Sequence, residues 1–438
     1  MNYHAYEMAH AMLSPMRLGV ETLKAGLNFP FNPFSNSPVA RNLSAACELF
    51  ENVTRRYGKP HFGIDSVKMG GLEVPIREEI VLRKPFCNLL HFDRDRAIAG
   101  DRYDPKVLIV APMSGHYATL LRGTVEAMLP EHNVYITDWT DARDVPLYEG
   151  RFDLDDFIDY IIDFVQFLGP NTHIIAVCQP AVPALAATAI MAAHEADIQP
   201  SSLTLMGGPI DTRRNPTVVN KLAQERSLEW FERNVIMTVP WPHAGVMRRV
   251  YPGFMQLTGF MTMNLERHMK AHQDLFNNLV KGDCDSVKQH QTFYDEYMAV
   301  MDLTEEFYLQ TVKTVFQDHA LPDGKMMHRG ERVDCSAIRK TAIITVEGER
   351  DDICGLGQTG AALDLCPNVP ADEKYHYVQQ GVGHYGVFNG TRWRTEIQPR
   401  IREMIRTVNY KRMIGGGDTR IPPPVAKLKA EPESMPVG

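Results

Sequence analysis

The chain has 438 residues, of which 44% are hydrophobic and 23% are charged. This length allows two or three domains, or one large α/β domain that carries an insertion. The formal net charge of −8 argues against a nucleic-acid-binding protein, because such proteins are usually basic.

Cysteine usage and hydropathy predict the compartment. The seven cysteines are an odd number without any C-x-x-C pair, which fits reduced thiols better than a disulfide framework or a zinc site. No run of 18 apolar residues occurs, so no transmembrane helix is expected. The residues from Met1 to Glu7 lack the basic segment and long apolar core of a secretory signal. These features predict a cytoplasmic protein.

Residues 1–60 are predicted to form a helical arm. Apolar residues recur at spacings of three or four along Met8, Met12, Met16, Val20, Leu23 and Leu27. Pro15 lies within this pattern, so a kink or a break is expected there. A second helix is predicted over about 38–57. The arm either packs on its own domain or serves as an oligomer contact or surface-binding segment, and a homo-oligomer remains open.

From about Val74 onward, strands alternate with helices, which predicts a mostly parallel sheet with helices on both faces. We assign residues 61–215 and 340–410 to this doubly wound α/β core. The strand-like runs are 73–82, 86–92, 106–112, 133–139, 174–177, 203–206, 341–346 and 375–378. A helix is predicted over 396–409, followed by a disordered tail over 411–438 that contains three consecutive glycines and three consecutive prolines.

Residues 216–339 interrupt this alternation. The segment is rich in methionine and aromatic residues, and its apolar positions have helical spacing in places, as at Phe293, Met298 and Met301. We predict a helical cap or lid inserted after the sixth core strand, whose apolar residues form mainly the core of the cap. Some of these apolar residues are expected to cover Cys178, the candidate nucleophile, and to line an apolar passage to it.

Cys178 lies where the apolar strand 174–177 stops and a helix rich in small residues begins. Strand, sharp turn and helix with a nucleophile at the turn is the layout of the nucleophile elbow, usually written G-x-S-x-G. Here Ala176 and Pro180 replace the glycines, and cysteine replaces serine. The alternative is a buried structural thiol, since free cysteine is among the most buried residue types.

Two later segments supply partners for Cys178. The strand 341–346 leads into Gly348-x-x-Asp351, a position for the acid of a catalytic triad, with Asp352 as the alternative. The strand 375–378 leads into a glycine-rich loop that contains His384, a candidate general base. The order nucleophile, acid, base is that of the α/β-hydrolases.

The sequence around these residues resembles intracellular polyhydroxybutyrate depolymerases. The resemblance rests on the elbow 177–180, the segments 135–139 and 142–146, the stretch 207–213 and the run 347–352. It implies an α/β-hydrolase fold with a catalytic triad of Cys178, Asp351 and His384. It also implies amorphous poly(3-hydroxybutyrate) in cytoplasmic storage granules as the substrate. The motifs are related more distantly to polyhydroxyalkanoate synthases, which usually keep glycines around their cysteine.

Ester cleavage also needs donors for the oxyanion. The amide of Gln179 is one candidate, because it follows the nucleophile at a helix N-terminus, and Met113 or Ser114 supplies the other. Water and a thiol such as coenzyme A both remain open as acyl acceptors. Two alternatives are a polyester synthase or acyltransferase, and a non-catalytic granule-surface protein.

Other polar residues receive a structural interpretation. His116 and His243 either touch the substrate or are structural histidines, and the second interpretation is favoured. No His, Asp and Glu set has the spacing of metal ligands, so no metal is predicted. The segment Gly355-x-Gly357 lacks a complete G-x-G-x-x-G pattern, so no nucleotide cofactor is predicted.

Overall fold

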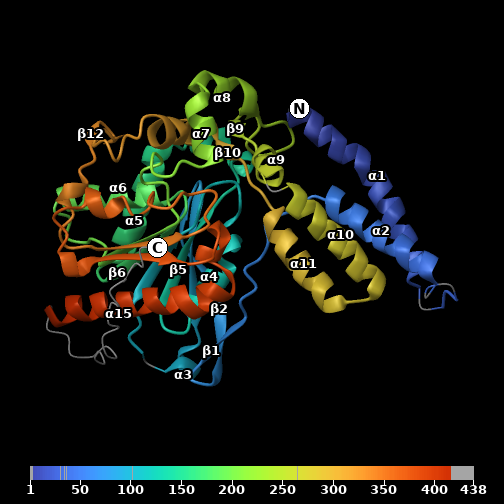
Figure 1. Cartoon of the computed structure of the whole chain (residues 1–438), viewed down its shortest axis with the longest axis horizontal. Coiled ribbons are helices and arrows are strands. Elements are labelled where there is room, and N and C mark those ends of the chain that lie inside the picture. The colour runs from blue at the N-terminus through green and yellow to red at the C-terminus, as the bar shows by residue number, and fades with distance from the viewer. Residues whose placement is uncertain are drawn as a thin grey trace, which may run out of the picture.

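The computed structural model describes residues 3–415, except residues 30, 34, 36, 101 and 264. Its centre is a nine-stranded sheet in the order β1-β2-β3-β5-β4-β6-β7-β13-β14 (Figure 1). The strands are β1 (Ser66–Met69), β2 (Leu72–Lys84), β3 (Cys87–Arg94), β4 (Lys106–Val110), β5 (Asn133–Trp139), β6 (Thr172–Val177), β7 (Ser202–Met206), β13 (Ala342–Gly348) and β14 (Lys374–Gln379).

The sheet changes from antiparallel to parallel at β5. Strands β1, β2 and β3 pair antiparallel, and β3 also pairs antiparallel with β5. All later pairs, from β5–β4 to β13–β14, are parallel. The reversed order of β4 and β5 followed by parallel strands is the arrangement of an α/β-hydrolase, which confirms the predicted fold class. Strand β1 was not predicted from the sequence.

Helices cover both faces of this sheet. Helix α5 (Leu154–Leu168) packs against α6 (Ala181–Ala193), and α4 (Arg122–Met128) packs against α15 (Gln398–Gly415). Strand β6 is buried along its whole length, which explains why its sequence is a continuous apolar run rather than an alternating one. Helix α15 extends to Gly415, five residues into the segment predicted as a tail, and residues 416–438 lie outside the described residues.

The chain between β7 and β13 forms a mainly helical insertion, as predicted, which also contains short strands. Its elements are α7 (Val218–Glu225), α8 (Leu228–Val235), β8 (Met237–Thr238), β9 (Arg249–Tyr251), α9 (Gly253–Met263), α10 (Leu265–Lys281), α11 (Cys284–Tyr297), β10 (Leu303–Thr304), α12 (Glu305–Thr311), a π-helical turn (Val312–Gln317), β11 (Met327–His328) and β12 (Glu331–Arg332). Strands β8, β9 and β10 pair as a small antiparallel sheet that the sequence did not predict.

Four helices form what we call the helical lobe: α1 (Tyr3–Leu27), α2 (Pro38–Thr54), α10 and α11. Helix α1 packs on α2, α2 packs on α10, and α10 packs on α11. The lobe projects away from the sheet (Figure 1, right). Helix α1 continues through Pro15 without a break.

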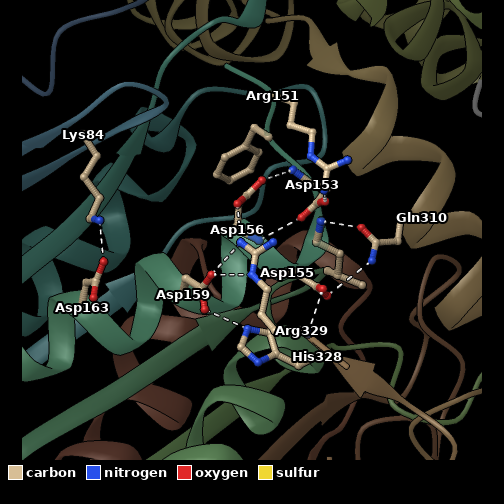
Figure 2. Close-up of polar contacts among 12 residues, drawn as sticks. Lys84, Arg151, Asp153, Asp155, Asp156, Asp159, Asp163, Gln310, His328 and Arg329 are labelled. Atoms are coloured by element: carbon tan, nitrogen blue, oxygen red, sulfur yellow. Dashed lines mark hydrogen bonds and ion pairs between the residues drawn. The ribbon is translucent and has the colours of Figure 1, made fainter. Parts of the chain in front are cut away.

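Ion pairs attach the last part of the insertion to helix α5 of the core. Arg329, between β11 and β12, contacts Asp156 and Asp159 on α5, and its amide donates to Asp155 (Figure 2). His328 lies 2.8 Å from the Asp159 Oδ1 atom. One guanidinium thus neutralises carboxylates that crowd the first turns of α5, where negative charge also interacts well with the helix dipole.

Candidate active site

Cys178 occupies the turn between β6 and α6 in a left-handed backbone conformation, with φ of 65°. A non-glycine residue adopts this conformation at a cost, which is typical of residues that a fold holds in place for function. The Cys178 amide donates to the Met206 carbonyl at 2.7 Å, and the Ala181 amide donates to the Cys178 carbonyl at 3.0 Å. The side chain is half-buried.

Two glycines after β7 make room for this turn. A Cβ atom on Gly208 would lie 2.1 Å from the Ala181 Cβ atom and 3.0 Å from the Cys178 carbonyl oxygen. Gly207 has φ of 56°, and its Cβ would lie 3.3 Å from His384 Cε1 and 3.4 Å from Asp351 Oδ2. Helix α6 and the His384 loop approach closely because both positions lack side chains.

Asp351 and His384 form a buried pair. Asp351 Oδ2 lies 2.8 Å from His384 Nδ1, while Oδ1 accepts the amides of Ile353 and Cys354 at 2.9 and 2.8 Å. These two amides fix the carboxylate, which in turn fixes the ring so that Nδ1 faces Asp351 and Nε2 is left for another partner. Asp352 is exposed instead. The structure therefore brings Asp351 to the histidine, and leaves Asp352 outside this contact.

The imidazole is linked to both other members of the predicted triad. Burial alone would lower the pKa of His384, but the charges of Cys178 and Asp351 and hydrogen bonds to both side chains raise this pKa well above its usual value. An imidazole in this setting is held as a cation when the neighbouring thiol is ionised. This is the electrostatic requirement for a cysteine nucleophile activated by histidine.

Gln179 has a feature that the sequence did not suggest. Its side-chain oxygen Oε1 accepts the Met113 amide at 3.4 Å, and its Nε2 atom is buried without a hydrogen-bond partner. The Met113 amide, one of the two predicted oxyanion donors, thus donates a weak hydrogen bond to the side chain of Gln179. The backbone amide of Gln179 is the other predicted donor. Ser114 is half-buried beside Met113.

The insertion reaches the same loop from the other side. A Cβ atom on Gly115, which has φ of 99°, would lie 2.5 Å from Gln256 Oε1 on α9. Tyr297, at the end of α11, has its ring centroid 6.2 Å from that of Tyr385, and Tyr385 lies 6.0 Å from the His384 ring. Burial raises the pKa of Tyr297 to about 12. Sequence reasoning missed these three side chains, although Tyr385 directly follows His384.

His116 and His243 connect elements rather than contacting the reacting residues. His116 is buried, its Nε2 lies 3.0 Å from the Tyr297 carbonyl, and burial lowers its pKa to about 4. A neutral histidine in that position donates a hydrogen bond and ties the loop after β4 to α11. His243 lies 3.5 Å from Glu7 of the N-terminal arm.

A buried pair of carboxylates joins the arm, the core and the insertion. The Tyr3 hydroxyl donates to Asp302 Oδ2 at 2.6 Å, and the Gly253 amide donates to Asp302 Oδ1 at 2.9 Å. The neighbouring Asp141 accepts the Asp302 amide at 3.1 Å and pairs with Arg143 at 2.8 Å. Burial and the charge of Asp302 raise the pKa of Asp141 to about 7, although Arg143 opposes the shift.

The described residues contain no candidate metal site and no helix that could cross a membrane. Over 3–415, with its five gaps, no group of three or more His, Cys, Asp or Glu side chains is placed to hold a metal ion. Within the same residues no helix is long and apolar enough to cross a membrane.

Comparison with known proteins connects part of the chain to a family. Residues 207–409 match the family model described as PHB de-polymerase C-terminus. The matched region contains Asp351 and His384 and begins after Cys178. No curated protein matches the chain.

The chain is also similar to solved hydrolase structures at low identity. They include a thermophilic esterase from Thermogutta terrifontis, with 12% identity over 79% of this chain and 97% of the esterase and a TM-score of 0.38. A monoacylglycerol lipase from Paleococcus ferrophilus shares 12% identity over 70% of this chain and 96% of the lipase, with a TM-score of 0.39. A hydrolase from Pseudomonas aeruginosa PA01 shares 12% identity over 76% and 98%, with a TM-score of 0.41.

Proposed function

We propose that this chain, whose residues 207–409 match the PHB depolymerase C-terminal family, hydrolyses ester bonds of poly(3-hydroxybutyrate) through a Cys178–His384–Asp351 triad. The observation that carries the proposal is the left-handed Cys178 at the elbow together with His384, which Asp351 orients at 2.8 Å and whose pKa the charge of Cys178 raises. The chemistry needs no cofactor and no metal.

The first half of the reaction forms an acyl-enzyme. His384 Nε2 takes the proton of the Cys178 thiol, and the sulfur attacks an ester carbonyl carbon. The tetrahedral oxyanion accepts hydrogen bonds from the amides of Gln179 and Met113, with Ser114 as the alternative to Met113. When the C–O bond breaks, His384 returns the proton to the leaving hydroxyl of the polymer. A thioester to Cys178 and a shortened chain with a free hydroxyl remain.

The second half resolves the thioester. Water, deprotonated by His384, adds to the carbonyl, and the thiolate leaves with the proton restored through the imidazole. The product is a 3-hydroxybutyrate monomer or oligomer with a free carboxylate. A thiol such as coenzyme A in place of water would give a 3-hydroxyacyl thioester by the same steps, and both acceptors fit this site chemistry.

The proposed setting follows from the substrate. Poly(3-hydroxybutyrate) is water-insoluble and uncharged, so the enzyme would act at the surface of storage granules in the cytoplasm. The thiol nucleophile is equally suited to acyl transfer from a coenzyme A thioester, which keeps a synthase or acyltransferase as the second candidate. A non-catalytic granule protein would have no use for the oriented Asp351–His384 pair.

The decisive experiment is release of 3-hydroxybutyrate from amorphous polymer by the wild type and by Cys178→Ala. We expect release by the wild type and none above background by the variant. Parallel incubation with 3-hydroxybutyryl-coenzyme A tests transfer, since polymer growth with release of coenzyme A, without polymer cleavage, would identify a synthase. Activity of neither kind would contradict both enzymatic assignments.

A further inference from the structure

The outward side of α1 exposes apolar residues that the active site does not explain. From Met8 to Gly19 every exposed position is uncharged: Met8, Ala9, Ala11, Met12, Ser14, Pro15, Met16, Leu18 and Gly19. Met8, Met12, Met16 and Leu18 are 58%, 68%, 56% and 66% exposed. We call these nine residues the α1 outer face.

Three of the four charged residues of α1 are half-buried and contact the rest of the protein. Glu7 pairs with Arg56, Arg17 donates to the Thr54 carbonyl at 2.5 Å, and Lys24 pairs with Glu48 and Glu51 at 2.7 and 2.6 Å. Glu21 is the one charged residue of Tyr3–Leu27 in an exposed position. A surface helix normally turns its charges to water and its apolar residues to the protein. Because α1 keeps three of its four charged residues half-buried and exposes an uncharged, mainly apolar stretch, its outer face is suited to contact something outside the chain.

The width of the face indicates the kind of partner. Successive residues are about 100° apart around the helix axis. Viewed down this axis, the arc that runs from Leu18 past Met8 to Met16 covers roughly half of the helix circumference. A partner helix in a coiled coil needs only a narrow seam, about two of every seven positions. The broad face fits an extended surface better than a second helix.

The composition of the face indicates the chemistry of that surface. No lysine or arginine occupies an exposed position of α1, so the face lacks the cations that draw amphipathic helices to anionic lipids. Methionine is unbranched and flexible, and it adapts to irregular apolar surfaces. An amorphous polyester is such a surface, because it is uncharged, rich in methyl groups and without a fixed shape.

We infer that the α1 outer face adsorbs the enzyme onto the surface of its uncharged polyester substrate, an inference that rests on the proposed function. The helical lobe links this face to the site, because α1 packs on α2, α2 on α10 and α10 on α11, which ends at Tyr297. Tyr297 in turn contacts Tyr385 beside His384. Adsorption through α1 therefore holds the part of the insertion that borders the triad at the polymer surface.

The test compares two double variants of the full chain. Met12→Lys with Met16→Lys puts two charges on the face while keeping good helix formers. Met247→Lys with Met327→Lys adds the same charges at exposed methionines elsewhere, which are 68% and 51% exposed. Co-sedimentation with protein-free amorphous poly(3-hydroxybutyrate) particles measures adsorption, and cleavage of a water-soluble 3-hydroxybutyrate trimer measures the triad.

We expect the Met12/Met16 variant to adsorb roughly 100-fold more weakly, about tenfold per methionine lost from apolar contact, with trimer cleavage unchanged. The Met247/Met327 variant should adsorb like the wild type. Undiminished adsorption of the Met12/Met16 variant would overturn the inference. The inference would also be overturned if the wild type were a dimer in light scattering and the Met12/Met16 variant a monomer. Wild-type binding to phosphatidylcholine vesicles as strong as its binding to the polymer would overturn it too.

The same measurements separate this inference from the proposed function. A wild type that adsorbs through α1 but cleaves neither trimer nor polymer contradicts the proposed function alone. A wild type that cleaves both, while the Met12/Met16 variant adsorbs normally, contradicts the adsorption role alone.

Discussion

Asp351 Oδ2 and His384 Nδ1 lie 2.8 Å apart in a buried contact, and the other oxygen of Asp351 accepts two backbone amides. The backbone amides of its own loop fix one oxygen of the Asp351 carboxylate, and the other oxygen orients the imidazole of His384. This single relationship joins the ends of two adjacent parallel strands, β13 and β14, at the same edge of the sheet as the Cys178 turn.

The first prediction concerns the acid. Asp351→Asn should reduce polymer hydrolysis on the order of 10³-fold or more, because an amide no longer stabilises the imidazolium and favours the wrong tautomer. The pKa of His384 should fall in an NMR titration, since Asp351 is one of the groups that raise it. Asp352→Asn is the matched control and should retain near-normal turnover. The reverse result would reassign the acid.

The second prediction concerns the nucleophile. Cys178→Ser should be about 100-fold or more slower than the wild type, because a hydroxyl is not held as an anion and the shorter Oγ misplaces the attacking atom. Steady-state turnover on amorphous polymer measures the effect, and circular dichroism controls for folding. Equal turnover of the two proteins would show that thiolate chemistry is not what this site requires.

The third prediction concerns the Gln179 side chain. Because the proposed oxyanion donor of Gln179 is its backbone amide, Gln179→Ala should change kcat less than tenfold. The side chain contacts the Met113 amide weakly, at 3.4 Å, so its removal frees that amide without removing a donor. A loss of about 100-fold or more in kcat would instead identify the side-chain amide as an oxyanion donor.

The fourth prediction concerns close packing behind the elbow. Gly208→Ala should destabilise the fold by about 1–3 kcal/mol and reduce turnover, because the added Cβ would lie 2.1 Å from that of Ala181. Gly259→Ala on α9 is the control, since nothing lies within 4 Å of its added Cβ and alanine favours helix. Urea unfolding compares the two. Equal stability of both variants would mean that α6 shifts freely.

The fifth prediction concerns pH and the buried carboxylates. The folded-state pKa of Asp141 is about 7, against an ordinary value of 3.8, so the folded chain binds a proton in this interval that the unfolded chain has lost. The stabilisation is complete below about pH 4 and is lost as the pH rises through about 7. The free energy of unfolding should therefore fall between about pH 4 and 7, by an amount on the order of a few kcal/mol from this group.

Asp302→Asn tests the cause of that slope. Removing the neighbouring charge should lower the pKa of Asp141 and flatten the decline in the free energy of unfolding between about pH 4 and 7. The amide can still accept the Gly253 N–H and contact the Tyr3 hydroxyl, so the fold is expected to persist. A slope in the variant as steep as in the wild type would assign the pH dependence to other groups.

The sequence predicted the parts of the fold that depend on local pattern. Fully buried strands such as β6 and β13 read as apolar runs, and the turn chemistry after them indicated Cys178, Asp351 and His384 as candidates. Contacts between distant segments left no such signal. The packing of α2 on α10, the hydrogen bond of Tyr3 to Asp302 and the short strands β8, β9 and β10 depend on tertiary pairing.

The sequence pattern also did not predict which side chain contacts the Met113 amide. Gln179 was predicted for its backbone amide, and nothing in its neighbours indicated that its side chain would cover Met113. Of the two outcomes considered at Pro15, a kink or a break, the break does not occur, because α1 runs unbroken from Tyr3 to Leu27.

The helical lobe sets an order of assembly during synthesis. Helices α1 and α2 leave the ribosome first, whereas α10, on which α2 packs, and α11 follow about half a chain later. At about 5–20 residues per second, the first hairpin waits roughly 10 to 50 seconds with the α1 outer face and the contact side of α2 both uncovered. Nascent chains that stall before α11 should therefore be the ones most dependent on chaperones and most easily trapped in aggregates.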